Sequence, residues 1–382
     1  VMFFMQHICR SGAMRVFTPA DFTIKRQVGQ LGFATETEWD YSGGRNPLDP
    51  NAPARTIEAS GTSVRLFEAA LDGRRCLLKE YLGDARDIGL NELAIYRHIC
   101  TAQSTAVNGN VAPIGTMLGH MQSDAAFESD SFRQQWRIML PSTSPPNAGN
   151  LWTVFAWEGL QTVAGFPRSS QTKEWWDFKG EAALKARGYF LKAVVLQSLA
   201  ALAWLHEQGV VHRAIGGSSL LLSTFDQRAS ASLQIRMIDL GFAASASTLS
   251  QEEVEKAMRR GAASPLEVLP LLALTDLHQL GYVLLELILA AFAISGGDIE
   301  RERIVEIQGL KRLVEDVFRD DLAGFREYCR EEPSWIAAVD LLDECDGAGW
   351  ALLQQLIDCH NPQVGSRSSA RELLASKWFS TR

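Results

Sequence analysis

The chain has 382 residues, of which 46% are hydrophobic and 21% charged, and its formal net charge is −8. This length and composition predict a globular protein with a two-lobed domain and extensions. The acidic balance argues against a broad nucleic-acid surface, which needs clustered basic residues. The six cysteines include no Cys-x-x-Cys pair, which indicates reduced thiols rather than a disulfide framework or a zinc site.

No stretch reaches the roughly 18 consecutive apolar residues that a membrane span needs. Leu280–Ser295 comes nearest, but Glu286 interrupts it, so we expect a buried helix there and no transmembrane segment. The start Val1–Met5 is typical of the remnant of a processed targeting sequence. These features predict an intracellular protein, soluble or peripheral, in the cytoplasm or in an organelle such as a plastid.

The first part of the chain is rich in predicted strands. Alternating apolar residues favour a strand in Asp21–Ala34, and Trp39–Ser60 has the Gly, Pro and Asn content of a loop. Asp72-Gly73 is a strong hairpin signal between two further strands. The elements expected up to the end of the first lobe are strands at Val64–Ala70 and Cys76–Tyr81, a helix at Asn91–Cys100, a strand near Ile114–Leu118, a Ser- and Pro-rich stretch at Ser142–Gly149 and a strand at Leu151–Ala156.

From Leu184 onwards the pattern is mainly helical. The expected helices are 184–208, 251–260, 276–294, 300–318, 321–330, 334–344, 348–358 and 368–376. Strands followed by helices predict an α+β fold in two lobes. We expect an N-terminal extension at 1–20, a β-rich lobe at 21–157 with loop insertions at 34–60 and 119–149, and a helical lobe at 158–382, joined near Trp157-Glu158-Gly159.

The stretch Trp204–Gly241 organises the second lobe. A helix ends at Gly209, and three short apolar runs then predict strands at Val210–Val211, Leu220–Leu222 and Ile235–Ile238. Polar side chains on the tight turns between such elements would be held at the mouth of a cleft.

Two tripeptides in this stretch carry a family resemblance. His212-Arg213-Ala214 and Asp239-Leu240-Gly241 stand where the eukaryotic-type protein kinase superfamily has His-Arg-Asp and Asp-Phe-Gly. In the family pattern H-R-D-x-x-x-x-N, this chain puts Ala214 at the Asp and Ser219 at the Asn, and Gly216 replaces the usual Lys. The chain therefore resembles a degenerate member of the superfamily, with a bilobal kinase-like fold.

The resemblance also implies a nucleotide site in the first lobe. Lys79 stands where the family has its strand Lys, Glu92 fits its carboxylate partner, and Asp239 fits the magnesium ligand. Only thirteen positions separate Lys79 from Glu92, so the helix must start early, and Glu80 is a lesser candidate partner.

The glycine-rich loop has two possible positions in the sequence. Aligned on Val64–Ala70, Gly61 stands at a family glycine, while Ala59 and Val64 occupy the other two. Alternatively the loop is Val28–Phe33, and Ala34–Ser60 is inserted within it. In either case the amides that should close over phosphates are obstructed by a Cβ or by a long excursion.

Further matches fall in the second lobe. Asp276 resembles the family carboxylate that starts a helix and anchors the His-Arg turn, and Ser264-Pro265-Leu266-Glu267 resembles Ala-Pro-Glu. The resemblance implies that Arg367 pairs with Glu267, and that Lys377-Trp378-Phe379 is the closing motif. His212 and Arg213 are expected to be structural.

These residues predict a pseudokinase that acts as a scaffold or as a regulatory or structural subunit, with no catalytic residue and no required cofactor. Protein partners are expected to bind through the loop insertions, and nucleic acid is not expected as a partner. The alternative is an atypical ATP- and magnesium-dependent Ser/Thr kinase that retains Lys79, Glu92 and Asp239, with a displaced residue such as Asp226 as the base. A third possibility is a structural subunit that binds no nucleotide.

Overall fold

The computed structural model describes residues 14–35, 58–104, 112–167, 181–259, 261–292, 307–359 and 368–380. It divides into two compact units: Val1–Ser104 with Thr116–Trp157, and Thr105–Gly115 with Glu158–Arg382. The fold is mixed α and β, with a six-stranded mixed sheet in the first unit and mainly helices in the second. The first unit ends at Trp157, where we expected the lobe boundary, but the described residues 112–115 belong to the second unit rather than to the β-rich lobe.

The first unit is built on one sheet, with strand order β1-β5-β6-β4-β3-β2. Neighbouring strands are antiparallel except for β1 and β5, which are parallel. The strands are β1 (Arg15–Val16), β2 (Phe22–Thr35), β3 (Glu58–Leu71), β4 (Arg74–Tyr81), β5 (Met117–Gln122) and β6 (Leu151–Ala156).

Two hairpins form half of this sheet. The β3–β4 turn is at the predicted Asp72-Gly73, whose φ angles of +50° and +75° favour an Asp-Gly pair. The β2–β3 pairing runs from Phe22↔Leu71 to Thr35↔Glu58. β3 is therefore longer than the expected Val64–Ala70, whereas β2 has the expected length and is shifted by one residue. The connection, residues 36–57, lies outside the described residues.

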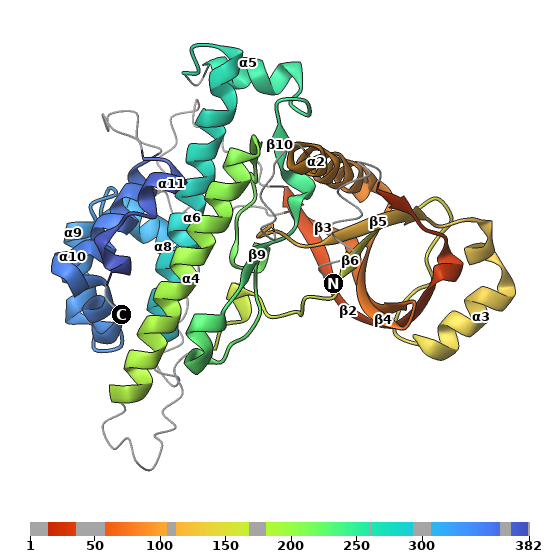
Figure 1. Ribbon diagram of the computed structural model, residues 1–382, viewed down its shortest axis with the longest axis horizontal. Coiled ribbons are helices and arrows are strands. Elements are labelled where there is room, and N and C mark those ends of the chain that lie inside the picture. The colour runs from red at the N-terminus through yellow and green to blue at the C-terminus, as the bar shows by residue number, and fades with distance from the viewer. Residues whose placement is uncertain are drawn as a thin grey trace, which may run out of the picture. The chain divides into compact units, whose positions relative to one another are not determined.

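A helix packs on each face of the sheet (Figure 1). On one face, α2 (Arg86–Ser104) places Tyr96 against Phe155 of β6, with ring centroids 5.7 Å apart. On the other face, α3 (Asp130–Met139) places Trp136 in a buried cluster with Phe67 and Trp152. Phe155 and Trp152 of β6 contact different helices because successive residues of a strand point to opposite faces of the sheet.

Helix α3 corrects the expectation that 119–149 is a loop insertion. The sequence contained the signal, because Phe132, Trp136 and Leu140 recur at helical spacing. Ser129 caps the helix by accepting a hydrogen bond from the backbone N–H of Phe132 at 3.3 Å. Segment 112–115 differs too: Ile114 bridges to Met237 in the second unit, and β5 begins only at Met117.

The second unit is mainly helical and contains two short strand pairs, β7–β10 and β8–β9. Gly281 lets two of its helices approach closely, since a Cβ there would lie 3.0 Å from the Cβ of Leu356. Its described helices and strands are α4 (Glu181–Glu207), β7 (Val210–Val211), β8 (Leu220–Leu222), β9 (Ile235–Met237), β10 (Ala244–Ser245), α5 (Gln251–Arg259), α6 (Val268–Phe292), α8 (Ile307–Arg312), α9 (Leu322–Glu331), α10 (Ile336–Asp358) and α11 (Ala370–Leu373).

Two helix boundaries are informative. Helix α6 begins at Val268, not at the expected residue 276. Pro270 is compatible with this start because it falls in the first turn, where a backbone N–H donor has no intrahelical acceptor. Helix α10 is broken at Glu344–Gly347, where Cys345, Asp346 and Gly347 all have positive φ. This break separates the two helices predicted at 334–344 and 348–358.

Two of the described helices, α4 and α6, are long and apolar enough by composition to cross a membrane. Core helices pass the same test, and 67% and 50% of the residues in the apolar windows of these two are buried inside the fold. Helix α4 also carries two buried cations that have partners within the protein. Arg187 donates to the carbonyl oxygen of Ala291, and Lys192 pairs with Glu344.

Candidate functional site

The first candidate site is a buried ion pair between β4 and α2. Lys79 Nζ lies 3.0 Å from Glu92 Oε1, and the two side chains are 6% and 0% exposed. The ammonium also lies 4.8 Å from the centre of the Phe155 ring. The expected Lys79–Glu92 pairing is therefore present, and α2 starts at Arg86, early enough to bring Glu92 opposite Lys79.

Sequence reasoning missed a third member of this site, Tyr81. Its hydroxyl donates a hydrogen bond to Glu92 Oε2, so both carboxylate oxygens accept from side chains of β4. Tyr81 is two residues after Lys79, which places both side chains on the same face of the strand. This alternation was a signal in the sequence that could have identified Tyr81.

Glu80, the lesser candidate partner of Lys79, points to the opposite face. It accepts hydrogen bonds there from Arg65 Nε at 2.7 Å and from Asn150 Nδ2 at 2.7 Å. Burial raises the pKa of Glu80, although Arg65 and Asn150 oppose that shift. Glu80 is therefore not a partner for Lys79, because adjacent residues of a strand point to opposite faces of the sheet.

The segments proposed for the glycine-rich loop are strands. Gly61, with Ala59 and Val64, lies inside β3, and the alternative Val28–Phe33 lies inside β2. Since these strands pair as far as Thr35↔Glu58, the long excursion belongs to the hairpin connection at 36–57. Neither Val28–Phe33 nor Ala59–Val64 is therefore a loop, and a role of Gly61 in nucleotide binding stays a prediction.

The second candidate site is the turn that follows β7. Asp276 lies inside α6, fully buried, and its two carboxylate oxygens accept from the backbone N–H groups of His212 and Arg213, each at 2.7 Å. His206 Nε2 is 3.0 Å from the same carboxylate. These contacts hold Arg213 at a φ of +69°, a conformation that costs a non-glycine residue roughly 1–3 kcal/mol.

The tip of this turn has no group for acid–base chemistry. Ala214 is exposed, and a methyl group can neither accept nor donate a proton. The Ser219 hydroxyl accepts from the N–H of Gly216 at 3.0 Å and donates to the carbonyl oxygen of Gly216 at 2.8 Å. Ser219 therefore closes the turn upon itself.

Asp239 lies next to this turn within the second unit. Ile238, which precedes it, donates its N–H to the carbonyl oxygen of Ser219 at 2.9 Å and accepts from His212 Nε2 at 3.0 Å. Asp239 itself has a φ of +65° and precedes a single 3-10 turn in which Leu240 is buried. The alternative base, Asp226, is exposed and caps its own turn by accepting from the N–H of Arg228 at 3.0 Å.

Arg213 connects this turn to the segment that follows Gly241, whereas Glu267 makes its contact within that segment. Arg213 Nη1 lies 2.7 Å from Glu253 Oε1 of α5. Glu267 is exposed and accepts from the N–H of Ala263 at 3.0 Å. Glu267 is thus exposed, and its expected partner Arg367 lies outside the described residues, so the pairing stays a prediction.

A magnesium ion of the kind the resemblance implies would find few oxygen ligands here. Asp239 offers a carboxylate, which Mg²⁺ bound to phosphates can use. Ser219 does not fit, because its hydroxyl already donates and accepts within the turn. Within the described ranges, no three His, Cys, Asp or Glu side chains are grouped so that they could hold a metal ion.

Comparison of the sequence with protein-family models and with curated proteins found no match. The kinase-like interpretation therefore depends on the order of the motifs and on the two sites described above.

Proposed function

We propose that this chain is a degenerate, kinase-like domain that does not transfer phosphoryl groups and acts as a scaffold or regulatory subunit. The turn at His212–Ser219 carries the proposal. Its architecture is elaborate, with a buried Asp276 and a strained Arg213, but the residue presented at its tip is Ala214. A fold that keeps such a turn without a reactive group at its tip retains the turn for packing.

The energetic argument concerns the missing base. A positioned acid or base contributes about 10²–10⁴ to the rate of a proton transfer step. Ala214 supplies no such group, and Ser219 is bound to Gly216 within the turn. In this proposal the domain has lost the group needed for phosphoryl transfer but has kept the packing of the turn.

A second candidate function is an atypical ATP-dependent phosphotransferase. The intact Lys79–Glu92 pair favours it, because that pair would position nucleotide phosphates. Against it, the Lys79 side chain is only 6% exposed, and its ammonium contacts both Glu92 and the Phe155 ring. Lys79 therefore serves first to hold α2 on the sheet.

An assay with labelled ATP and magnesium distinguishes the scaffold from the phosphotransferase. We expect no phosphate to be incorporated into the chain or into generic acceptor proteins. Incorporation that survives purification and disappears in Asp239→Ala would establish the phosphotransferase. A thermal shift with ATP, with and without magnesium, then separates a scaffold that binds nucleotide from one that does not.

The proposed partner is a protein and the proposed compartment is intracellular. The segment 119–149 is one natural contact surface, because the last turn of α3 leaves the apolar side chains of Ile138 and Met139 exposed. The other expected insertion, 34–60, lies almost wholly outside the described residues.

A further inference from the structure

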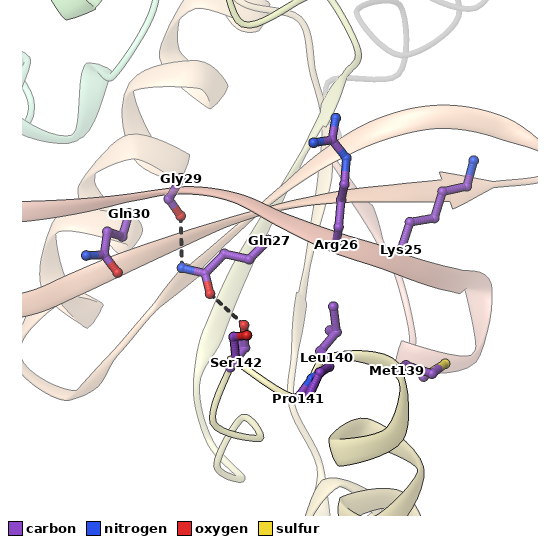
Figure 2. A pocket seen from close by; sticks show the side chains of 10 residues that line it. Lys25, Arg26, Gln27, Gly29, Gln30, Met139, Leu140, Pro141 and Ser142 are labelled. Carbon is purple, nitrogen blue, oxygen red and sulfur yellow. Dashed lines mark hydrogen bonds between the residues drawn. The ribbon is translucent and has the colours of Figure 1, made fainter.

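A groove runs beside β2 in the first unit. It has a volume of about 430 Å³ and lies between the part of β2 from Lys25 to Gln30 and the segment Met139–Thr143 that follows α3 (Figure 2). β2 is the end strand of the described sheet, so the groove lies along the edge of that sheet. Bulges at Lys25 and Val28 interrupt the alternation of side chains along β2, which allows consecutive residues to line the groove.

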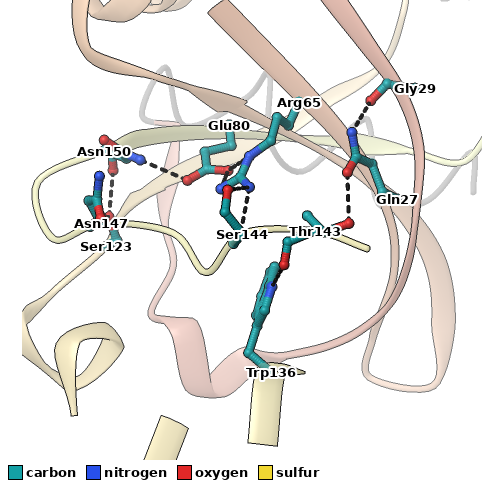
Figure 3. A network of polar contacts seen from close by, with 10 residues as sticks. All are labelled: Gln27, Gly29, Arg65, Glu80, Ser123, Trp136, Thr143, Ser144, Asn147 and Asn150. Atoms are coloured by element: carbon teal, nitrogen blue, oxygen red, sulfur yellow. Dashed lines mark hydrogen bonds and ion pairs between the residues drawn. The ribbon is translucent and has the colours of Figure 1, made fainter. Parts of the chain in front are cut away.

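The groove is preformed, because its second wall is fixed to the unit at several points (Figure 3). Gln27 joins the two walls: its Nε2 donates to the carbonyl oxygen of Gly29 at 3.2 Å, and its Oε1 accepts from Thr143 Oγ1 at 2.9 Å. The buried Trp136 donates from Nε1 to the carbonyl oxygen of Thr143 at 2.9 Å. A rigid site loses less entropy on binding than a loop that must first be ordered.

A buried ion pair fixes the continuation of that wall. Arg65 donates from Nη1 to the Ser144 carbonyl oxygen at 2.5 Å, and its guanidinium lies 2.6 Å from Glu80. Arg65 and Glu80 are 6% and 0% exposed in their side chains. Breaking such a pair is costly, so Arg65 holds Ser144 firmly against β3.

The chemistry of the groove is basic and partly apolar. Lys25 and Arg26 line it, and no acidic side chain does so in the described part of the chain. Arg26 pairs with Glu68 at 2.9 Å, whereas Lys25 has no ion-pair partner among the described residues. Met139, 46% exposed, adds an apolar contact, and the neighbouring Ile138 is 75% exposed. In a chain of net charge −8, a groove of this character is complementary to an acidic ligand.

We propose that this groove binds a short acidic segment, with interspersed apolar residues, from a partner protein. The inference extends the proposed scaffold role and depends on it. Lys25 supplies the charge recognition, and Met139 accepts an apolar side chain. A second copy of the chain is a poorer occupant, because β2 is bulged at Lys25 and Val28, and bulges oppose regular edge-to-edge pairing of strands.

The test uses the full chain and a fluorescein-labelled peptide of alternating glutamate and leucine, with an alternating lysine and leucine peptide for comparison. Fluorescence anisotropy, without nucleotide, should show binding of the acidic peptide only, and added salt should weaken it. Lys25→Glu should weaken binding up to about fivefold, since one exposed charge pair contributes up to about 1 kcal/mol. Met139→Ala should also weaken it, at unchanged salt dependence.

Arg74→Glu is the matched control. Arg74 is exposed in the same sheet, on the β3–β4 hairpin, and does not line the groove. Equal binding of both peptides, no binding of the acidic one, or an equal loss in Arg74→Glu would each overturn the assignment. Self-association that Lys25→Glu abolishes would overturn it in favour of a second copy. Phosphate transfer from ATP to a version of the acidic peptide that carries one serine would refute the scaffold role and leave the groove assigned, so the two failures are distinguishable.

Discussion

The substitution Asp276→Asn tests the architecture of the turn at His212. Asp276 is fully buried and accepts from two backbone N–H groups at 2.7 Å and from His206 at 3.0 Å. Asparagine has the same shape but only one acceptor oxygen, so its NH₂ group would face one of the two N–H donors. The carboxylate charge that strengthens the remaining bonds is also lost.

The expected cost follows from these contacts. A hydrogen bond to a charged group contributes roughly 1.5–3 kcal/mol, and a buried donor left without an acceptor costs roughly 1–3 kcal/mol. We therefore expect Asp276→Asn to lower the free energy of unfolding of the second unit by about 3 kcal/mol or more. Amide hydrogen exchange at His212 and Arg213 should accelerate, since both N–H groups depend on this carboxylate.

Urea unfolding followed by tryptophan fluorescence measures the first quantity, and mass-resolved hydrogen exchange measures the second. Asp226→Asn is the matched control, because Asp226 is exposed, accepts one bond as a cap, and asparagine caps equally well. That variant should be neutral. A loss below about 1 kcal/mol in Asp276→Asn, or unchanged exchange at the turn, would refute the reasoning.

Three further predictions concern both units. Tyr81→Phe removes one of the two donors to a buried carboxylate and should destabilise the first unit by about 1–3 kcal/mol in urea unfolding; an unchanged midpoint would show that the hydroxyl contributes nothing. The double variant Ala214→Asp with Ser219→Asn should still show no ATP turnover with magnesium or manganese. It should also be less stable than the parent, because the hydroxyl that closes the turn is lost. Clear turnover would contradict the proposed function. Burial alone would raise the pKa of Glu253, but hydrogen bonds from Ser250 and the charge of Arg213 outweigh it and hold that pKa below its usual 4.5. The stability that Glu253 contributes is therefore complete above pH 4.5 and lost as the pH falls through the lowered pKa, so exchange protection of α5 should decrease below pH 4.5 in the parent and vary less in Glu253→Gln.

Local structure was largely predictable because neighbouring residues encode it. Asp72-Gly73 accepts the positive φ angles of a tight hairpin turn, and Gly209 ends α4 at a φ of +69°. The strand at Leu151–Ala156 has the bounds that its apolar run indicates. These features depend on backbone sterics and on periodicity over a few residues.

The candidate site was predictable only where a motif or a strand period identified its members. Lys79 and Glu92 were expected to pair and do so, whereas Tyr81 and Gln279 were not foreseen. Gln279 accepts from the N–H of Ile215, 64 positions earlier in the chain. A glutamine in an apolar helix carries no signal for such a partner.

What the sequence by itself determined is the order of strands and helices, the Lys79 and Glu92 positions, and the absence of a carboxylate at Ala214. Tertiary structure alone decided that α3 covers the second face of the sheet, and that Glu80 belongs to Arg65 rather than to Lys79. The physical reason is separation along the chain. A turn or a strand period involves residues a few positions apart, whereas the bond from Arg65 to Ser144 joins residues 79 positions apart and exists only once the sheet and α3 have packed together.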